Sequence, residues 1–234
     1  MRRRVAVYAG TRNLYHKMAV AAKSLTAHTR MDKVVFLTED NEFPEWLPDI
    51  VEIKNVSGQT WFSPEGPNFV SHWTWMTMMR VVIPWLLPDE DMALSLDVDT
   101  IVTDDVGPLF DTDLGDNVIG MVEEPTRSKR PFMYFNMGVA LMDIPAMNGW
   151  GIVSELVETL NKRKLDFIDQ DAVNMRCQGR ILPINPIWNS CQFTREPLDA
   201  RIIHFAANRQ YENERLFRQA ESMEWKVMKD AGNA

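Results

Sequence analysis

Cysteine is scarce in this chain, and long apolar runs are missing. The sequence has only two cysteines, Cys177 and Cys191, and their separation matches no metal-binding spacing. Two isolated thiols indicate a protein of a reducing compartment, so we expect the cytoplasm. The apolar run at residues 5–9 is too short for a signal peptide, and no segment approaches the roughly 20 apolar residues that span a bilayer. We therefore predict no transmembrane segment.

An excess of basic residues is also absent. The 234 residues include 33 acidic and 25 basic side chains, which gives a formal net charge of −8 at pH 7. Nucleic-acid binding depends on basic surface that displaces counterions, so this balance argues against nucleic acid as a partner. Internal repeats and polar linkers are lacking too. The length and the ordinary hydrophobic content of 45% predict one domain over residues 1–234.

Strand and helix patterns alternate along the chain. Buried strands are predicted at residues 4–9, 33–38, 50–53, 92–96, 118–122, 134–143, 181–183 and 201–204, and helices at 15–27, 71–86, 150–160, 171–177 and 211–228. This alternation favours an α/β fold with a central, mainly parallel mixed sheet flanked by helices. Ser71 is the expected N-cap of the helix at 71–86, and Pro84 is expected to kink or end it.

Asp97 and Asp99 directly follow the predicted strand at 92–96. With one apolar residue, Val98, between them, strand geometry would place both carboxylates on one side. Two adjacent anions repel unless a cation lies between them, and hard oxygen ligands suit Mg²⁺ or Mn²⁺. The pair is a weak motif on its own, because exposed turn aspartates give the same pattern.

Four further polar residues stand in contexts that favour a function. Arg80 lies in a helix rich in Trp and Met and needs an anionic partner, an aspartate or a phosphate. His204 ends an apolar strand, where both a structural histidine and a metal ligand are open interpretations. Asp169 begins a helix that it could cap, and the neutral amide of Gln170 could accept a hydrogen bond or face a developing cation.

Taken in order, these motifs resemble family 8 of the retaining glycosyltransferases, which contains glycogenin and bacterial lipopolysaccharide galactosyltransferases. No single motif is decisive, but the ordered set is specific and spans most of the chain. The segments that carry the resemblance are Val7-Tyr8-Ala9 with Val20-Ala21-Ala22-Lys23-Ser24, Arg80, Leu96-Asp97-Val98-Asp99, Tyr134-Phe135-Asn136-Met137-Gly138-Val139, Asp169-Gln170-Asp171 and Ile202-Ile203-His204-Phe205. The resemblance implies the GT-A fold, a nucleotide-binding α/β sandwich.

The resemblance also implies an activity, that of a metal-dependent retaining glycosyltransferase moving a hexose from UDP-glucose or UDP-galactose to an acceptor. Asp97, Asp99 and His204 would bind Mn²⁺ or Mg²⁺ under the donor diphosphate. Asp169 and Gln170 would be catalytic, with attack of the acceptor on the leaving-group face. The residues implied to contact the nucleotide and sugar are Ala9, Gly10, Thr11, Asn13, Arg80, Asp97, Val98, Asn136 and Met137.

Two segments depart from the family pattern. After the first strand the family has an acidic and an aromatic residue for base recognition, where this chain has Thr11 and Leu14. After the histidine motif the family has a glycine and then Lys-Pro-Trp, where this chain has Ala207, Arg209 and Tyr211. We therefore expect the contacts to the base and to the diphosphate to differ from those of the family.

Two alternatives belong to other functional classes. A non-catalytic relative that binds nucleotide sugars or glycans would keep the motifs and lose the transfer. A phosphatase of the haloacid dehalogenase type also uses an Asp-X-Asp after a strand, but it has Thr two positions after the second Asp, where this chain has Ile101. The expected partners are a nucleotide-sugar donor and an acceptor, and the sequence does not specify an oligomeric state.

Overall fold

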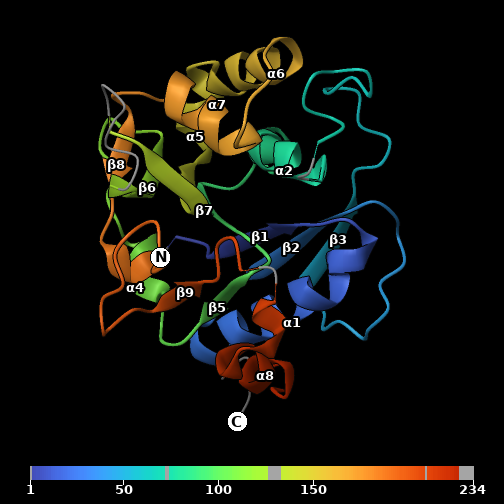
Figure 1. Ribbon diagram of the computed structural model, residues 1–234, viewed down its shortest axis with the longest axis vertical. Helices are drawn as coiled ribbons and strands as arrows, with labels where there is room; N and C mark the ends of the chain where they lie inside the picture. The colour runs from blue at the N-terminus through green and yellow to red at the C-terminus, as the bar shows by residue number, and fades with distance from the viewer. Residues whose placement is uncertain (1, 72–73, 126–132, 209, 227–234) are drawn as a thin grey trace.

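A seven-stranded sheet forms the centre of the computed structural model, which describes residues 2–71, 74–125, 133–208 and 210–226 (Figure 1). Its strand order is β3-β2-β1-β4-β7-β6-β8. The strands are β1 Val5–Ala9, β2 Lys33–Thr38, β3 Val51–Asn55, β4 Met92–Leu96, β6 Ile119–Glu123, β7 Phe135–Asp143 and β8 Ile181–Pro183. β7 is antiparallel to its neighbours β4 and β6, and the other pairs are parallel. The predicted mainly parallel mixed sheet is confirmed.

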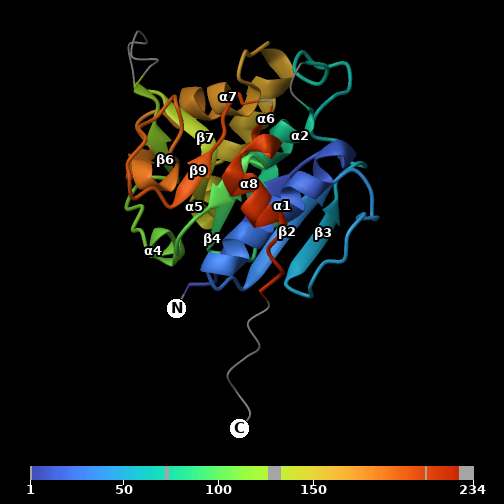
Figure 2. The ribbon, with the colours of Figure 1, turned by 60° about the horizontal axis from the view of Figure 1, so that its bottom comes forward.

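Helices cover both faces of this sheet (Figure 2). The helices are α1 Tyr15–His28, α2 Met76–Met79, α3 Ile83–Leu86, α4 Gly107–Phe110, α5 Ile144–Gly149, α6 Ile152–Lys162, α7 Ile168–Arg176 and α8 Arg215–Glu221. In β1, Val5 and Val7 join the core under α2, α5, α6 and α7, whereas Ala6 and Tyr8 join the core under α1. Successive side chains of a strand point to opposite faces, so an all-apolar strand requires cover on both. Among the described helices, none combines the length and apolar character needed to cross a membrane.

A second sheet has two strands, of which only one was predicted from the sequence. It pairs β5, Thr100–Val102, antiparallel with β9, Ile202–His204, and its register places Thr100 opposite His204. The strand predicted at 201–204 is confirmed, but β5 was not predicted. This small sheet brings the end of β9 to the turn that follows β4.

The single helix predicted over residues 71–86 is wrong. The described part of this segment contains α2, the 3₁₀ turn η2 Arg80–Val82 and α3, and Trp75 instead of Ser71 precedes the first helical residue. Residues 72–73 lie outside the described ranges. Pro84 has no N–H to donate to the carbonyl of Arg80, and the Ile83 N–H takes that carbonyl in a tighter 3₁₀ bond.

Two other helices also differ from prediction. α7 begins at Ile168, earlier than the predicted 171, which puts Asp169 and Gln170 in its first turn. The continuous helix predicted at 211–228 is wrong, because η5 Tyr211–Asn213 and α8 are separated by Glu214 in an extended conformation. Residues 222–226 lie beyond the end of α8, and residues 227–228 are outside the described part of the chain.

Replacement of Asn68 by Ala is expected to destabilise the fold. The fully buried Asn68 side chain donates to Leu160 O at 2.6 Å and Arg163 O at 2.7 Å, and it accepts from Leu165 N at 3.0 Å. Buried backbone groups without partners cost about 1–3 kcal/mol. Urea unfolding should show a loss of this size for Asn68→Ala. The exposed Asn55→Ala is the control, and equal losses in both variants would contradict the assignment.

Candidate functional site

The chain turns sharply at the end of β4, and this turn carries two aspartates. The Asp97 N–H donates to Gly138 O at 2.8 Å, which extends the β4–β7 pairing by one residue. Thr100 closes the turn by donating from N and from Oγ1 to Asp97 O at 3.2 and 2.7 Å. The strand geometry expected for the Asp97–Asp99 pair is therefore wrong, yet both carboxylates face the same histidine.

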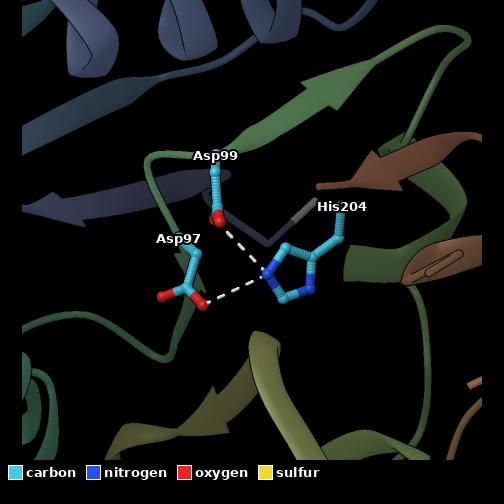
Figure 3. Close-up of side chains that lie close together, drawn as sticks. All are labelled: Asp97, Asp99 and His204. Carbon is cyan, nitrogen blue, oxygen red and sulfur yellow. Dashed lines mark ion pairs between the residues drawn. The ribbon is translucent and has the colours of Figure 1, made fainter. Parts of the chain in front are cut away.

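The His204 ring faces both carboxylates from one side (Figure 3). Its Nε2 is 3.5 Å from Asp97 Oδ2 and 3.3 Å from Asp99 Oδ1. One ligand atom from each of the three residues lies within 4.8 Å of the others. Two carboxylate oxygens and an imidazole nitrogen at this separation fit a divalent cation.

Electrostatics within this triad favour a positive charge at its centre. Burial opposes protonation of His204, but the carboxylates of Asp99 and Asp97 raise its pKa well above the usual 6.5. Burial likewise opposes ionisation of Asp99, yet His204 brings the pKa of that carboxyl below its usual range. Without a bound cation, protonated His204 thus supplies the positive charge that stabilises the two carboxylates.

Arg80 joins three parts of the site. Its guanidinium, in a residue only 4% exposed, donates from Nη1 to Asp97 Oδ1 at 2.5 Å and to Asp169 Oδ2 at 3.1 Å. Nε donates to Ser95 Oγ at 3.0 Å, and Nη2 donates to Met137 O. The predicted need for an anionic partner is met by two aspartates, so Arg80 links β4, β7 and α7.

Asp169 is buried in the first turn of α7 and does not cap that helix, because Phe167 occupies the N-cap position. Its carboxylate pairs with Arg80 instead. Burial raises the pKa of Asp169 to about 6, although Arg80 acts in the opposite direction. A carboxyl with this pKa is mostly ionised at neutral pH and remains sensitive to its surroundings.

The amide of Gln170 is held in one orientation. Its Oε1 accepts from the Met137 N–H at 3.0 Å, while Nε2 donates to Glu124 Oε2 at 3.0 Å and to the Tyr134 hydroxyl at 3.2 Å. These bonds attach the first turn of α7 to β6 and to the start of β7. The predicted ability of Gln170 to accept a hydrogen bond is thus used within the protein.

These side chains surround a cavity of about 250 Å³. The residues predicted from the sequence that line it are Ala9, Arg80, Asp97, Val98, Asp99, Met137, Asp169 and Gln170. The remaining lining residues are Leu14, Thr74, Thr77, Phe167 and Ile168. Of these five residues, only Leu14 was identified from the sequence. The other four lie in segments whose apolar pattern predicts a buried core and gives no indication of a binding site.

Five of the predicted residues are not in the lining of the cavity: Gly10, Thr11, Asn13, Asn136 and His204. Gly10 packs closely against α1, and Thr11 Oγ1 donates to Asn13 Oδ1 at 2.6 Å in the turn η1 Arg12–Leu14. Asn136 and His204 are buried, 4% and 6% exposed. These five residues thus form two groups. Gly10, Thr11 and Asn13 belong to the segment before α1, and Asn136 and His204 are buried.

The segment after His204 is used for packing. Ala207 has a φ of 61°, a left-handed conformation that disfavours a side chain, and Arg209 lies outside the described residues. Tyr211 stacks on Phe205 at 5.8 Å between ring centroids, and the ammonium of Lys17 lies 4.9 Å from the Tyr211 ring centroid. Position 211 thus anchors the loop against α1.

Sequence analysis missed Asn189. This residue is fully buried, and its Oδ1 lies 2.9 Å from His204 Nδ1. It follows η4, Pro186–Trp188, in irregular structure. The only signal in the sequence is a polar residue between Trp188 and Cys191, which is too weak to identify a partner of His204.

Comparison with known proteins gives one family. Residues 6–211 match the family model described as Glycosyl transferase family 8. The curated "Glycosyltransferase GlyE" of Streptococcus pneumoniae serotype 4 (strain ATCC BAA-334 / TIGR4) is 28% identical over 184 residues, which are 74% of this chain and 42% of that protein. "General stress protein A" of Bacillus subtilis (strain 168) is 27% identical over 134 residues, 51% of this chain and 47% of that protein. The chain spans less than half the length of either relative.

Solved structures agree on the fold. The crystal structure of the galactosyltransferase LgtC, in complex with donor and acceptor sugar analogs, aligns with a TM-score of 0.73 and 20% identity over 96% of this chain and 98% of that one. The structure of GlyE from Streptococcus pneumoniae TIGR4 aligns with a TM-score of 0.73 and 20% identity over 96% of this chain and 62% of that one. The predicted GT-A fold is confirmed.

Gly138→Ala is expected to displace His204. A Cβ at position 138 would overlap Cε1 and Nδ1 of the His204 ring and lie 2.9 Å from Asn136 Oδ1. Overpacking of this kind costs about 1–3 kcal/mol, and the displaced ring should also weaken binding of Mn²⁺. Thermal melting and Mn²⁺ titration measure the two effects. Gly149→Ala is the control, because nothing lies within 4 Å of a Cβ there, and identical behaviour of both variants would refute the clash.

Cation binding is expected to release a proton from His204. The raised pKa keeps His204 protonated in the cation-free protein, whereas a metal ligand must be neutral. The affinity for Mn²⁺ should therefore rise about tenfold per pH unit above 6.5 until His204 is deprotonated. Titration calorimetry in buffers of different ionisation enthalpy measures the released proton, and a pH-independent affinity in this range would contradict the assignment.

The raised pKa of His204 also makes the stability of the cation-free protein decrease as pH rises, whereas the affinity for Mn²⁺ increases. Because the folded pKa of His204 is raised, its contribution to stability is complete below pH 6.5 and is lost as pH rises through that raised pKa. Melting temperatures with and without Mn²⁺ should therefore diverge as pH increases. Parallel curves over this range would show that His204 is not the group involved.

Proposed function

Because this chain belongs to glycosyl transferase family 8, we propose that it is a metal-dependent retaining glycosyltransferase that moves a hexose from a nucleotide sugar to an acceptor. The donors we propose are UDP-glucose and UDP-galactose. The observation that carries the proposal is the convergence of Asp97, Asp99 and His204 beside one cavity. The likeness to a galactosyltransferase over nearly the whole chain supports a hexose as the transferred group.

Mn²⁺ or Mg²⁺ is the cation that we propose for the triad. Asp97 and Asp99 would each supply a carboxylate oxygen, and His204 would supply Nε2, since its Nδ1 is bonded to Asn189. When bound, the cation supplies Lewis-acid neutralisation of the charge that grows on the departing diphosphate. Burial of the imidazole against Gly138 keeps it in position beforehand, which reduces the cost of assembling the site.

Asp169 and Gln170 are proposed to act on the sugar. As the bond to the diphosphate breaks, the sugar ring gains positive charge, which a fixed carboxylate and a fixed carbonyl dipole stabilise. The pKa of about 6 leaves Asp169 mostly ionised at neutral pH, and Arg80 holds its carboxylate at 3.1 Å. A carboxylate already paired with a guanidinium is a weakened nucleophile, so electrostatic stabilisation is the role we assign to it.

We infer that the acceptor attacks on the leaving-group face. Gln170 carries a neutral amide, which is a poor covalent nucleophile, and its bonds to Met137 N and Glu124 fix it in place. In this mechanism the acceptor oxygen forms the new glycosidic bond as the bond to the diphosphate breaks, and the hydroxyl proton passes to the departing diphosphate. Retention then requires no glycosyl-enzyme intermediate.

The nucleotide is proposed to lie along the segment between β1 and α1. Ala9 and Leu14 line the cavity there, and Gly10, Thr11 and Asn13 stand between these two residues in the chain. The Thr11 hydroxyl and Asn13 amide offer donors and acceptors to a base where the family has an acidic residue. Leu14 offers apolar contact where the family has a stacking aromatic, which supports a weaker grip on uridine.

The phosphatase alternative has little support. Ile101, at the position where that class has Thr, is buried in β5 with 2% exposure. The non-catalytic binder differs from our proposal in one outcome only, which is binding of a nucleotide sugar without metal-dependent turnover.

Asp97→Asn and Asp99→Asn are expected to reduce Mn²⁺-dependent release of UDP from UDP-glucose or UDP-galactose. Loss of several kcal/mol of Lewis-acid stabilisation corresponds to about 100-fold or more in rate. A coupled assay for UDP measures the rate. Asp104→Asn is the matched control, because its side chain is 64% exposed and close in sequence, and it should stay near wild type.

Two results would count against the proposal. Donor binding to the wild-type protein without any metal-dependent turnover would favour the non-catalytic binder. Equal rates in all three variants would show that the aspartates of the triad play no part in turnover.

A further inference from the structure

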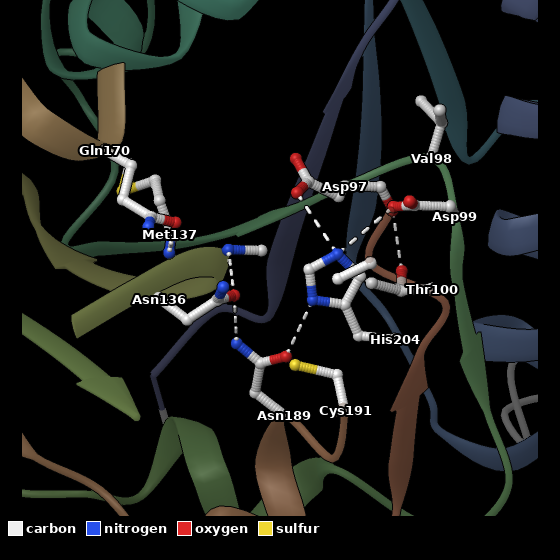
Figure 4. A network of polar contacts seen from close by, with 12 residues as sticks. Asp97, Val98, Asp99, Thr100, Asn136, Met137, Gln170, Asn189, Cys191 and His204 are labelled. Carbon is white, nitrogen blue, oxygen red and sulfur yellow. Dashed lines mark hydrogen bonds and ion pairs between the residues drawn. The ribbon is translucent and has the colours of Figure 1, made fainter. Parts of the chain in front are cut away.

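Hydrogen bonds connect His204 to β7 through two asparagines (Figure 4). His204 Nδ1 lies 2.9 Å from Asn189 Oδ1, and Asn189 Nδ2 lies 2.8 Å from Asn136 Oδ1. The Gly138 N–H donates to the same Asn136 oxygen at 2.9 Å. His204, Asn189 and Asn136 are 6%, 0% and 4% exposed, so the polar atoms of this series find their hydrogen-bond partners mainly within the protein.

The Gly138 N–H fixes the donor and acceptor roles of the side-chain atoms in this series of hydrogen bonds. The Gly138 N–H can only donate, so the Asn136 atom facing it is the carbonyl oxygen. The Asn189 atom facing that oxygen is then the amide nitrogen, and its other terminal atom is the oxygen. His204 Nδ1 consequently carries a hydrogen, which leaves Nε2 as the nitrogen that faces the two carboxylates.

We propose that Asn189 is a positioning residue that holds neutral His204 in the Nδ1–H tautomer and directs the Nε2 lone pair at the cation site. This inference rests on the proposed cation-binding role of Asp97, Asp99 and His204. Partners that orient metal-binding histidines commonly change metal affinity by about 10- to 100-fold. Asn189 would therefore act on the cation without touching it.

The same bonds orient the amide of Asn136. Both of its hydrogen bonds end on Oδ1, and within the described part of the chain its Nδ2 donates to no acceptor. Asn189 thus fixes which terminal atom of the Asn136 side chain is the oxygen.

The backbone of Asn189 is held independently of its side chain. Its N–H donates to Pro186 O at 3.1 Å, and its carbonyl accepts from Thr194 Oγ1 at 2.6 Å. A side-chain substitution can therefore break the series of hydrogen bonds while these two contacts keep the loop in place.

Asn189→Leu tests the proposal, because leucine has a similar volume and no hydrogen-bonding atoms. Long-range ¹H–¹⁵N NMR of the wild-type protein should show the Nδ1–H tautomer of His204, both in the cation-free protein at a pH where the ring is neutral and in the Mg²⁺ complex. Asn189→Leu should show a mixture of tautomers. Calorimetric titration should show its Mn²⁺ affinity reduced about 10- to 100-fold, with thermal melting as the measure of folding.

Two further variants separate positioning from packing. Asn189→Asp keeps an acceptor for the Nδ1 hydrogen but loses the donor to Asn136 Oδ1, so it should restore the wild-type tautomer and recover part of the Mn²⁺ affinity lost in Asn189→Leu, at some cost in stability. Cys191→Ala removes a buried thiol that contacts the same imidazole, and it should leave the tautomer unchanged.

The outcomes are distinct for the two proposals. An Nε2–H tautomer in the wild-type protein overturns the inference, as does an Asn189→Leu variant with the wild-type tautomer and Mn²⁺ affinity. A wild-type protein that binds no divalent cation overturns the proposed function instead, and the cation-free NMR measurement still decides the tautomer. That wild-type measurement stands even if Asn189→Leu does not fold.

Discussion

The buried guanidinium of Arg80 is the interaction on which the candidate site depends. It lies where the end of β4, the start of β7 and the first turn of α7 meet, and it finds oxygen acceptors on all three. A buried cation is costly unless it is paired and fully hydrogen-bonded, so the arrangement is stable only while Asp97 and Asp169 keep their places. Asp97 also belongs to the triad with His204. Asp97, which is proposed to bind the cation, and Asp169, which is proposed to act on the sugar, are therefore held by the same guanidinium.

The predictable parts of the fold are those that local pattern controls. β1, β2 and β4 are continuous apolar runs because both faces of the sheet are covered, and their predicted and observed bounds nearly coincide. β5 escaped prediction because its three residues have no periodicity and its partner β9 is distant in sequence. The 3₁₀ turn at Arg80–Val82 escaped because apolar spacing does not register the missing N–H of Pro84.

The candidate site shows the same division. Asp97 and Asp99 follow one apolar strand and His204 ends another, but it was the ordered resemblance to the family that assigned all three to one metal, and the structure brings them together. Asn189 follows no strand or helix pattern, and its relation to His204 depends on how an irregular segment folds back against β9. The orientation of Gln170 likewise arises from backbone and side-chain groups of β6 and β7 that no local pattern connects to it. Residue types and their order identify the candidate site residues, whereas the groups that hold these residues in place are visible only in three dimensions.

The charges around the cavity do not cancel before a cation arrives. Asp97, Asp99 and Asp169 contribute three negative charges at neutral pH, while Arg80 and protonated His204 contribute two positive ones. Exchange of the His204 proton for the proposed divalent ion would remove the remaining negative charge. An anionic ligand is repelled by the first state and not by the second. If the cavity binds a divalent ion and a nucleotide diphosphate as we propose, this charge balance would favour entry of the ion before the diphosphate, and the nucleotide sugar would bind more weakly to the metal-free protein.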